Sequence, residues 1–240
     1  MSIDKSHHAG GPDRSVGEVI RALQALASPR DAEGMRRFGI GGKLPLLGVS
    51  MSKLRPLARR LGRNQALALK LWQAGVHEGR MLAALVAEPK LVTARQMDAW
   101  SRDFDSWDIC DGVCLHLFRQ TPYAWAKAVV WSRRRTEFVK RAGFVLMATL
   151  AVHDQAAPDE RFLRLLPMIV RDAGDERNFV KKAVNWALRQ IGKRNETLRR
   201  EAIRTAEKIR ELDSPAARWV AADALRELQK HDPRRRAPKK

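Results

Sequence analysis

The 240-residue chain has few cysteines, a single tyrosine and no long apolar run. Cys110 and Cys114 are four residues apart, so on a helix they stack one turn above each other. Two cysteines are too few for a disulfide framework, and we interpret both as packing residues. No window approaches the roughly 18 apolar residues of a spanning helix, and the N-terminal residues lack the apolar core of a signal peptide. We therefore expect a cytoplasmic protein, nucleoid-associated if bacterial, with no membrane partner.

The common phosphate-binding and nucleophile motifs are also absent. The short GIGG segment at 39–42 has neither the rest of a phosphate-loop pattern nor a preceding strand. No nucleophile elbow and no histidine-rich metal motif is present. The sequence therefore predicts neither a nucleotide-binding loop nor a metal site.

Acidic residues are also few relative to basic ones. The chain has 46 Lys and Arg but 27 Asp and Glu, which gives a formal charge of +19. A field of that sign favours a polyanionic partner. Nucleic acid is the first candidate and an anionic membrane surface the second. Solubility alone is the plain alternative, but the charge exceeds what a small domain needs for it.

Helical patterns follow one another along most of the sequence. We expect disordered tails over 1–14 and 232–240, and a single domain over 15–231. Apolar residues recur at three- and four-residue spacing, and the longest patterns predict helices over 136–154 and 175–194. About a dozen helices, paired at a spacing of roughly 35 to 45 residues, predict an all-α, right-handed α-solenoid of HEAT-like pairs with a concave basic groove. The alternative is a compact, non-repeating helical bundle.

The segment DSWDICDGVC at 105–114 places acids among apolar residues. Trp107 and Asp111 are spaced i,i+4 and share one helical face. Asp108 has a plain explanation as an acid at a helix start. Asp111 lies nearer the apolar side, where a carboxylate is costly unless it is paired or functional. Arg141, inside the apolar pattern FVKRAGFVLMATL, needs a carboxylate or a phosphate nearby for the same reason.

Tryptophan is abundant, with seven in the chain. On spacing alone Trp186 belongs to a core stripe with Phe179, Ala183 and Ile191, because tryptophan on a helix is more often core than site. The same interpretation applies to the remaining tryptophans outside the 105–114 segment: Trp72, Trp100, Trp125, Trp131 and Trp219.

Several segments, taken in order, resemble the DNA alkylation repair glycosylases, the AlkD-like HEAT-repeat enzymes. The resemblance covers most of residues 17–230. It is carried by LGVSMSKLR, LALKLWQAGVHEGRMLAALV, DSWDICDGV, EFVKRAGFVLMATL and NFVKKAVNWALRQIGKRN. It implies a monofunctional glycosylase that removes cationic alkylated purines, such as 3-methyladenine and 7-methylguanine, from double-stranded DNA. No cofactor is implied, because the charged base is already an activated leaving group, and no pocket for a flipped base is implied either.

The resemblance also implies a set of site residues. By motif position, Trp107, Asp111, Arg141 and Trp186 line the DNA-facing groove. Asp111 would stabilise the sugar cation and position a water, the two tryptophans would offer π faces to the lesion, and Arg141 would hold a phosphate and counterbalance the acid. Further phosphate contacts are expected from nearby cations, for which a solvated surface is the alternative: Lys140, Lys181, Lys182, Arg133, Arg134 and Arg135.

Two positions depart from the family pattern. Met51 stands where a proline often follows GVS, and Phe38 is the nearest candidate where some members present a tyrosine to DNA. We expect a monomer without an obligate protein partner. Two other functions remain open, namely a non-catalytic solenoid that binds duplex or branched DNA, and a protein-interaction scaffold.

Overall fold

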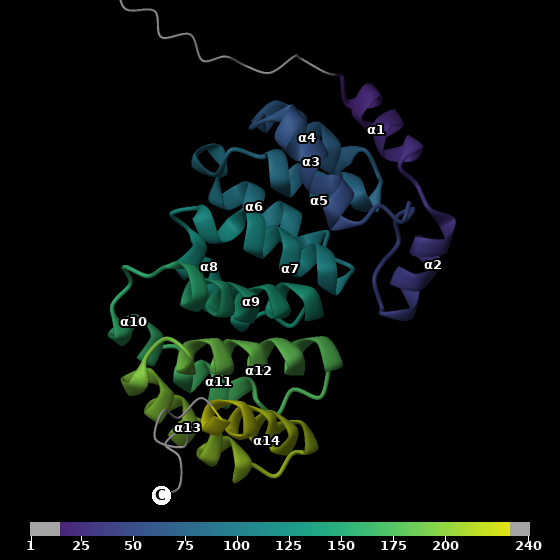
Figure 1. Ribbon diagram of the computed structural model, residues 1–240. Coiled ribbons are helices and arrows are strands. Elements are labelled where there is room, and N and C mark those ends of the chain that lie inside the picture. Colours follow the sequence, from purple (N-terminus) through teal and green to yellow (C-terminus); the bar gives the residue numbers. More distant parts are fainter. Residues whose placement is uncertain (1–14, 231–240) are drawn as a thin grey trace, which may run out of the picture. The chain divides into compact units, whose positions relative to one another are not determined.

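The computed structural model describes residues 15–230, and this part of the chain is helical with short connections and no strand (Figure 1). The expectation of an all-α fold is confirmed. The tails expected over 1–14 and 232–240 lie outside the described residues. Across 15–230, no helix combines the length and the apolar character needed to cross a bilayer. The chain forms two compact units, which divide between Val92 and Thr93.

The first unit ends at Val92 and contains five α-helices and one 3-10 turn in its described residues. They are α1 (Val16–Ala25), α2 (Pro29–Arg37), α3 (Met51–Leu61), α4 (Gln65–Gln73), α5 (His77–Val86) and η1 (Pro89–Leu91). Side-chain caps at Ser15, Ser28 and Asn64 set the starts of α1, α2 and α4, because each oxygen accepts a hydrogen bond from a first-turn amide. Both α3 and α4 pack against α5.

A buried acid holds the connection before α3. The carboxylate of Glu78 accepts hydrogen bonds from the backbone amides of Leu47, Gly48 and Val49, at 3.0, 2.7 and 3.1 Å. Gly48 has φ of +79°, and a Cβ there would lie 2.2 Å from the carbonyl oxygen of Ser28. This close approach explains why the segment needs glycine at that position.

The second unit begins at Thr93. Its elements are α6 (Ala94–Arg102), α7 (Trp107–His116), η2 (Phe118–Gln120), α8 (Ala124–Ser132), α9 (Glu137–His153), α10 (Asp159–Leu163), α11 (Leu166–Asp172), α12 (Asn178–Gly192), α13 (Glu196–Arg210) and α14 (Pro215–Lys230). It includes the longest helices of the described residues, α9, α12, α13 and α14. Within this unit α9 packs against α8, α7 and α12, and α12 packs in turn against α14. Helices α7, α9, α12 and α14 therefore form one row, with partners such as α8 and α13 behind it.

The helix at the centre of this row is α9. Twelve of its 17 residues are buried, which follows from its almost uninterrupted apolar sequence. Gly143 allows the closest approach, because a Cβ added there would lie 2.4 Å from the backbone nitrogen of Ser132 at the end of α8. The packing of α9 fixes where the side chains of its first two turns lie.

Candidate functional site

The strongest polar feature of the row is an ion pair between α7 and α9. Arg141 donates from Nε to Oδ1 of Asp111 at 2.8 Å and from Nη2 to Oδ2 at 2.7 Å. Its Nη1 donates to the backbone carbonyl of Phe179, in the first turn of α12, at 2.5 Å. The Arg141 side chain is 7 % exposed and that of Asp111 19 %. One guanidinium therefore connects three neighbouring helices and fixes the orientation of the carboxylate.

This geometry bears on the role expected for Arg141. Each of its three guanidinium nitrogens makes a hydrogen bond inside the protein, and the side chain is only 7 % exposed. A planar guanidinium matches a carboxylate in this two-bond arrangement better than a lysine would. Arg141 therefore orients and counterbalances Asp111, whereas its contact with a DNA phosphate stays a prediction.

Burial and pairing act in opposite directions on the two groups. Burial raises the pKa of Asp111 above its ordinary value of 3.8, and the charge and hydrogen bonds of Arg141 offset this only in part. Burial lowers the pKa of Arg141, but the charge of Asp111 and its hydrogen bonds outweigh that effect and leave the pKa raised. Arg141 stays a cation, whereas Asp111 takes up a proton more readily than an exposed aspartate.

The neighbouring residues of α7 behave as the sequence predicted. Asp108 lies in the first turn of the helix and accepts a short hydrogen bond from the hydroxyl of Ser106. Cys110 and Cys114 are buried, are not joined by a disulfide, and pack their sulfurs toward the carbonyls of Phe138 and Ala142 on α9. Burial raises the pKa of the Cys110 thiol well above its ordinary value. The packing interpretation of both cysteines is confirmed.

The two candidate tryptophans lie on the outer helices of this group of three. Trp107 opens α7 and is partly exposed, one turn before Asp111. Trp186 lies on α12 and is partly exposed, between the buried Asn185 and Ala187. Trp186 therefore differs from the buried stripe of α12, which is Val180, Ala183, Val184, Ala187, Leu188 and Ile191. Interpreting Trp186 as a pure core residue does not fit its exposure.

The predicted lysine contacts separate into three cases. Lys140 is paired with Asp172 at 2.7 Å and Asp175 at 3.2 Å, so its charge is already balanced within the protein. Lys181 lies over the ring of Trp219, with its Nζ 5.2 Å from the ring centroid. Lys182 is exposed. Lys140 is thus a weaker candidate for a phosphate contact than Lys181 or Lys182.

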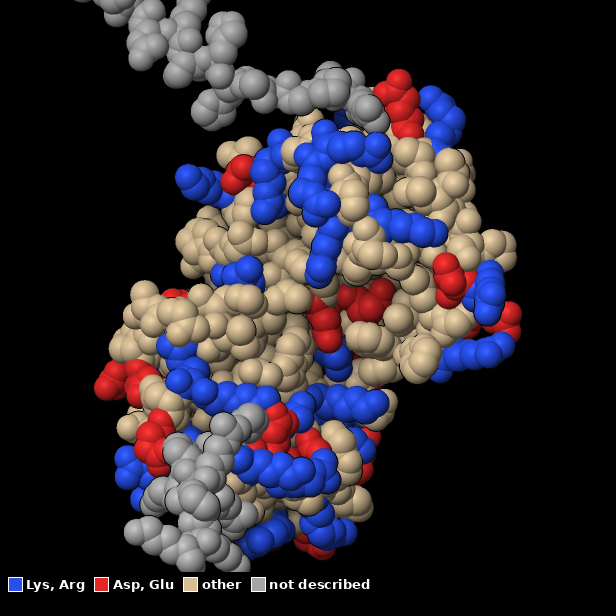
Figure 2. Space-filling model, in the orientation of Figure 1, with Lys and Arg blue, Asp and Glu red and all other residues tan. Residues whose placement is uncertain are grey.

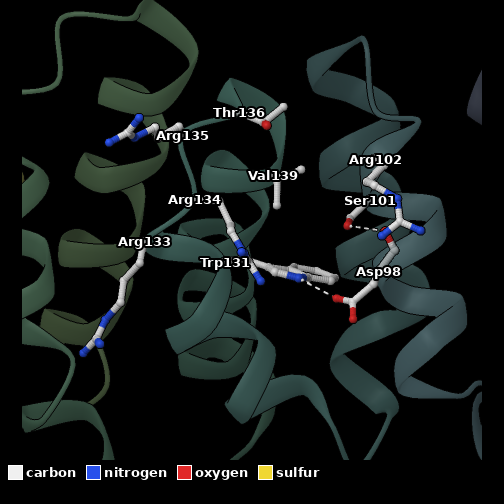
Figure 3. Close-up of a pocket in the computed structure, with 9 residues that line it drawn as sticks. All are labelled: Asp98, Ser101, Arg102, Trp131, Arg133, Arg134, Arg135, Thr136 and Val139. Carbon is white, nitrogen blue, oxygen red and sulfur yellow. Dashed lines mark hydrogen bonds between the residues drawn. The ribbon is translucent and has the colours of Figure 1, made fainter.

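The arginine run at 133–135 lies in the turn between α8 and α9, and all three residues are exposed. It borders a hollow of about 610 Å³ whose walls include Asp98, Arg102 and Trp131 (Figure 3). No sequence pattern identifies Arg102 or Asp98 as site residues. Both lie on α6, about 30 residues before the turn, and only the packing of adjacent helical pairs brings them together.

The surface in Figure 2 shows Lys and Arg side chains spread over both units, with acidic side chains among them near α12 and α14. Ion pairs link α12 and its C-terminal cap to α14, including Arg189 with Asp223 and the cap residue Lys193 with Glu227. Within residues 15–230, no group of three or more His, Cys, Asp or Glu side chains is arranged to hold a metal ion.

Comparison with known sequences gives the family. A profile described as "DNA alkylation repair enzyme" matches residues 19–228, which is nearly all of the described chain. The chain belongs to the DNA alkylation repair enzyme family. The resemblance carried by the sequence motifs is thereby confirmed at the level of the family.

Relatives of this family member include an uncharacterized protein of Listeria innocua, 23 % identical over 190 residues that cover 78 % of this chain and 83 % of that protein. A second, from Listeria monocytogenes, is 31 % identical over 88 residues, covering 35 % of this chain and 39 % of that one. A solved structure matches with a TM-score of 0.74 and 20 % identity, over 90 % of this chain and 96 % of that one. That structure belongs to a family described as related to the HEAT-like repeat DNA glycosylases with affinity for branched DNA structures. The match confirms the all-α, HEAT-like fold.

Proposed function

We propose that this DNA alkylation repair family member is a monofunctional glycosylase that hydrolyses the N-glycosidic bond of cationic alkylated purines in double-stranded DNA. The substrates would be lesions such as 3-methyladenine and 7-methylguanine. The observation that carries the proposal is the carboxylate of Asp111, held by Arg141 yet still partly exposed. Trp107 precedes it by one turn, and Trp186 lies on the next helix but one of the row.

The chemistry needs little from the protein beyond a placed negative charge. The alkylated base already carries a positive charge, so the electrons of the glycosidic bond leave with the base, which departs neutral. The sugar remains as an oxocarbenium-like cation at C1′, which a carboxylate stabilises. A water then attacks C1′ and loses its proton to Asp111 or to solvent. The products are a free base and an abasic site.

The Asp111–Arg141 pair restricts where this stabilisation acts. Because the pair is neutral overall, its field falls off faster than that of a lone carboxylate. Arg141 is the more buried partner, so a cation that approaches from solvent meets Asp111 first. The carboxylate is aligned before the substrate arrives, which removes the cost of reorienting it during bond cleavage.

The partly exposed tryptophans would provide the second contribution. An indole face near a cationic base or sugar contributes about 0.5 to 2 kcal/mol. Lys181, Lys182 and the arginines at 133–135 would contact phosphates on either side of the lesion. In this proposal the protein acts as a monomer, with a single domain over 15–231, no cofactor and no obligate protein partner.

A second candidate function is non-catalytic DNA binding. It is favoured by the solved structure described above, since its family has affinity for branched DNA structures. It is disfavoured by the carboxylate of Asp111, because a negative charge on a phosphate-binding surface weakens binding unless it has another use.

The test is base release from duplex DNA that contains N7-methylguanine. We expect release by the wild-type protein and a loss of about 100-fold or more in Asp111→Asn, by analogy with the removal of other groups that stabilise transition-state charge. Asp108→Asn is the matched control, because it makes the same change one turn earlier on α7 and should retain most of the rate. Circular dichroism of each variant checks that the helices are retained.

Two results would overturn the proposal. Tight, salt-dependent DNA binding without base release by the wild type would favour the non-catalytic binder. Absence of any DNA binding would leave a protein-interaction scaffold.

A further inference from the structure

The hollow between α6 and the α8–α9 turn lies within the second unit and outside the Asp111–Arg141 pair. Its volume is about 610 Å³. Figure 3 shows Arg102 and Arg134 on opposite sides of the space above Trp131, whereas Arg133 and Arg135 extend away from Asp98. Two guanidinium groups from different helical pairs thus face one space.

The one acid on its wall is already satisfied by other groups. Asp98 accepts hydrogen bonds from Nζ of Lys127 at 2.6 Å and from Nε1 of Trp131 at 3.0 Å. Burial acts to raise the pKa of Asp98, but these bonds and the nearby cations outweigh it and lower the pKa. Asp98 is therefore a fixed anion whose charge Lys127 balances, and it leaves the arginines without a matching acid.

The arginines themselves lack close partners. Among residues 15–230, the guanidinium of Arg134 has no hydrogen bond or ion pair, and Arg102 has only the longer-range attraction of Asp98. Like charges that face one hollow from opposite sides repel each other, so an anion that enters the hollow gains favourable interactions with both. The first-turn amides of α9 add to this field, because the cap residue Thr136 makes no side-chain cap hydrogen bond.

The shape of the hollow favours a phosphate over a base. Its apolar floor is Trp131 and Val139, which are only 1 % and 7 % exposed. Trp131 therefore offers no free ring face on which a base could stack. The groups that remain available are donors: two guanidinium groups and the hydroxyl of Thr136. Donors without an aromatic face match the nonbridging oxygens of a phosphodiester.

The hollow and the candidate catalytic pair share α9. Thr136 and Arg141 are five residues apart, which is about 7.5 Å along a helix axis. One DNA strand rises about 3.4 Å per nucleotide. A strand that occupies the hollow is thus within a few nucleotides of Asp111.

We propose that Arg102 and Arg134 form a clamp that binds backbone phosphates of the DNA strand passing the start of α9, near the nucleotide presented to Asp111. The proposal rests on the proposed function for its ligand, which is DNA. It assigns a binding role to Arg102 and a hydrogen-bonding partner to Arg134.

The test measures the salt dependence of binding to unmodified duplex DNA by fluorescence anisotropy. For the double variant Arg102→Gln with Arg134→Gln, we expect a several-fold rise in Kd. The plot of log K against log salt concentration should be shallower by about 2, since each lost phosphate contact removes about 0.9 from the slope. The double variant Arg102→Lys with Arg134→Lys should keep most of the wild-type slope, because counterion release depends on charge rather than on guanidinium shape.

The matched control removes the same charge elsewhere in the second unit. Arg164 and Arg210 are exposed arginines at the ends of α10 and α13, and Arg164→Gln with Arg210→Gln should leave the slope nearly unchanged. Equal slopes for the wild type and the Arg102,Arg134 variant, or an equal loss in the control, would overturn the clamp.

Base release by the wild type, measured in parallel, separates the two proposals. A shallower slope without base release keeps the clamp and removes the glycosylase. Base release with an unchanged slope in the Arg102,Arg134 variant supports the glycosylase and overturns the clamp.

Discussion

At Asp111, burial and the adjacent guanidinium shift the pKa of the carboxyl in opposite directions. Burial dominates, so the pKa of this carboxyl lies above 3.8 in the folded protein. The proposed mechanism needs the carboxylate, which is present above that raised pKa and is lost as the pH falls through it. We therefore expect the single-turnover rate of base release to decline on the acid side, with an apparent pKa above that of an exposed aspartate. A pH profile, corrected for uncatalysed release, measures it.

The control for this profile is Asp111→Asn, which has no carboxyl to titrate at that position. Its residual rate should lack the acid decline. A decline of the same shape in both proteins would assign the titration to a different group.

The same pair allows a stability prediction. Removing one partner of a buried ion pair leaves an uncompensated charge and costs about 3 to 5 kcal/mol, with the lower end fitting a partly exposed pair. A lone Asp111 can become neutral by taking a proton, but a lone Arg141 cannot lose one. Asp111→Leu should therefore lower the free energy of unfolding more than Arg141→Met does.

The double variant Asp111→Leu with Arg141→Met completes the cycle. It should be more stable than the sum of the single losses implies, because it buries no unpaired charge. Urea unfolding followed by circular dichroism measures all four proteins. Additive losses would mean that the pair contributes no coupling to stability.

Much at this scale could be predicted from spacing. The i,i+4 relation of Trp107 and Asp111, the place of Asp108 at a helix start and the packing of the cysteines all depend on residues within one helix. The partners of Lys140 could not be predicted in this way, because Asp172 at the end of α11 and Asp175 in the connection after it lie more than 30 residues away. Local periodicity carries no information about which distant acid reaches a given lysine.

Among the helices, the contact between α8 and α9 depends on a single glycine. A Cβ at Gly143 would lie 2.4 Å from the nitrogen and 2.9 Å from the Cα of Ser132, and backbone atoms cannot move aside as a flexible side chain can. Gly143→Ala should therefore lower the free energy of unfolding by about 1 to 3 kcal/mol through overpacking, even though alanine favours helix. Thermal and urea unfolding measure this loss.

Gly34 in α2 offers the matched substitution. No atom lies within 4 Å of a Cβ added there, so Gly34→Ala should keep or raise stability by up to about 1 kcal/mol. If the two substitutions had the same effect, helix propensity alone would account for both and the close approach would be irrelevant.

Helix boundaries followed the apolar pattern well where caps are local. The prediction of a helix over 136–154 compares with Glu137–His153 for α9. The helix predicted over 175–194 begins later, at Asn178. Asp175 is held outside it, because its carboxylate accepts hydrogen bonds from Arg177 and Lys140. The local hydrogen bonds from Arg177 and the long-range one from Lys140 keep Asp175 outside the helix, which therefore begins later than the sequence pattern suggests.

On the scale of the whole second unit, polar links join one helical pair to the next. Lys127 reaches back 29 residues to Asp98, Arg141 reaches back 30 to Asp111, and Asn185 reaches forward 38 to Asp223. The last separation lies within the repeat spacing inferred from the helical rhythm, and the first two are somewhat shorter. The spacing of the helical pairs could be predicted from the sequence. The residue contacts between neighbouring repeats could not, because the repeats are too dissimilar in sequence to be aligned with one another.

The formal charge of +19 pointed to a polyanionic partner, and membership of a DNA alkylation repair family agrees with that expectation. The charge alone overstates the cations available for binding. Lys140, Arg141 and Arg189 are all held by acids within the second unit. The cations without such acids, including the run at 133–135, are the better candidates for DNA contacts.

The burial of α9 also affects how the protein can fold while it is being synthesised. Its apolar surface is covered by α7 and α8, which precede it, and by α12, which is synthesised about 25 residues later. The carbonyl that receives the third hydrogen bond of Arg141 belongs to Phe179, so the bonding of that side chain is incomplete until α12 has emerged and docked. A nascent chain that ends before α12 would carry the acid and the arginine but expose one side of the largely apolar helix α9, a surface for chaperones or for aggregation.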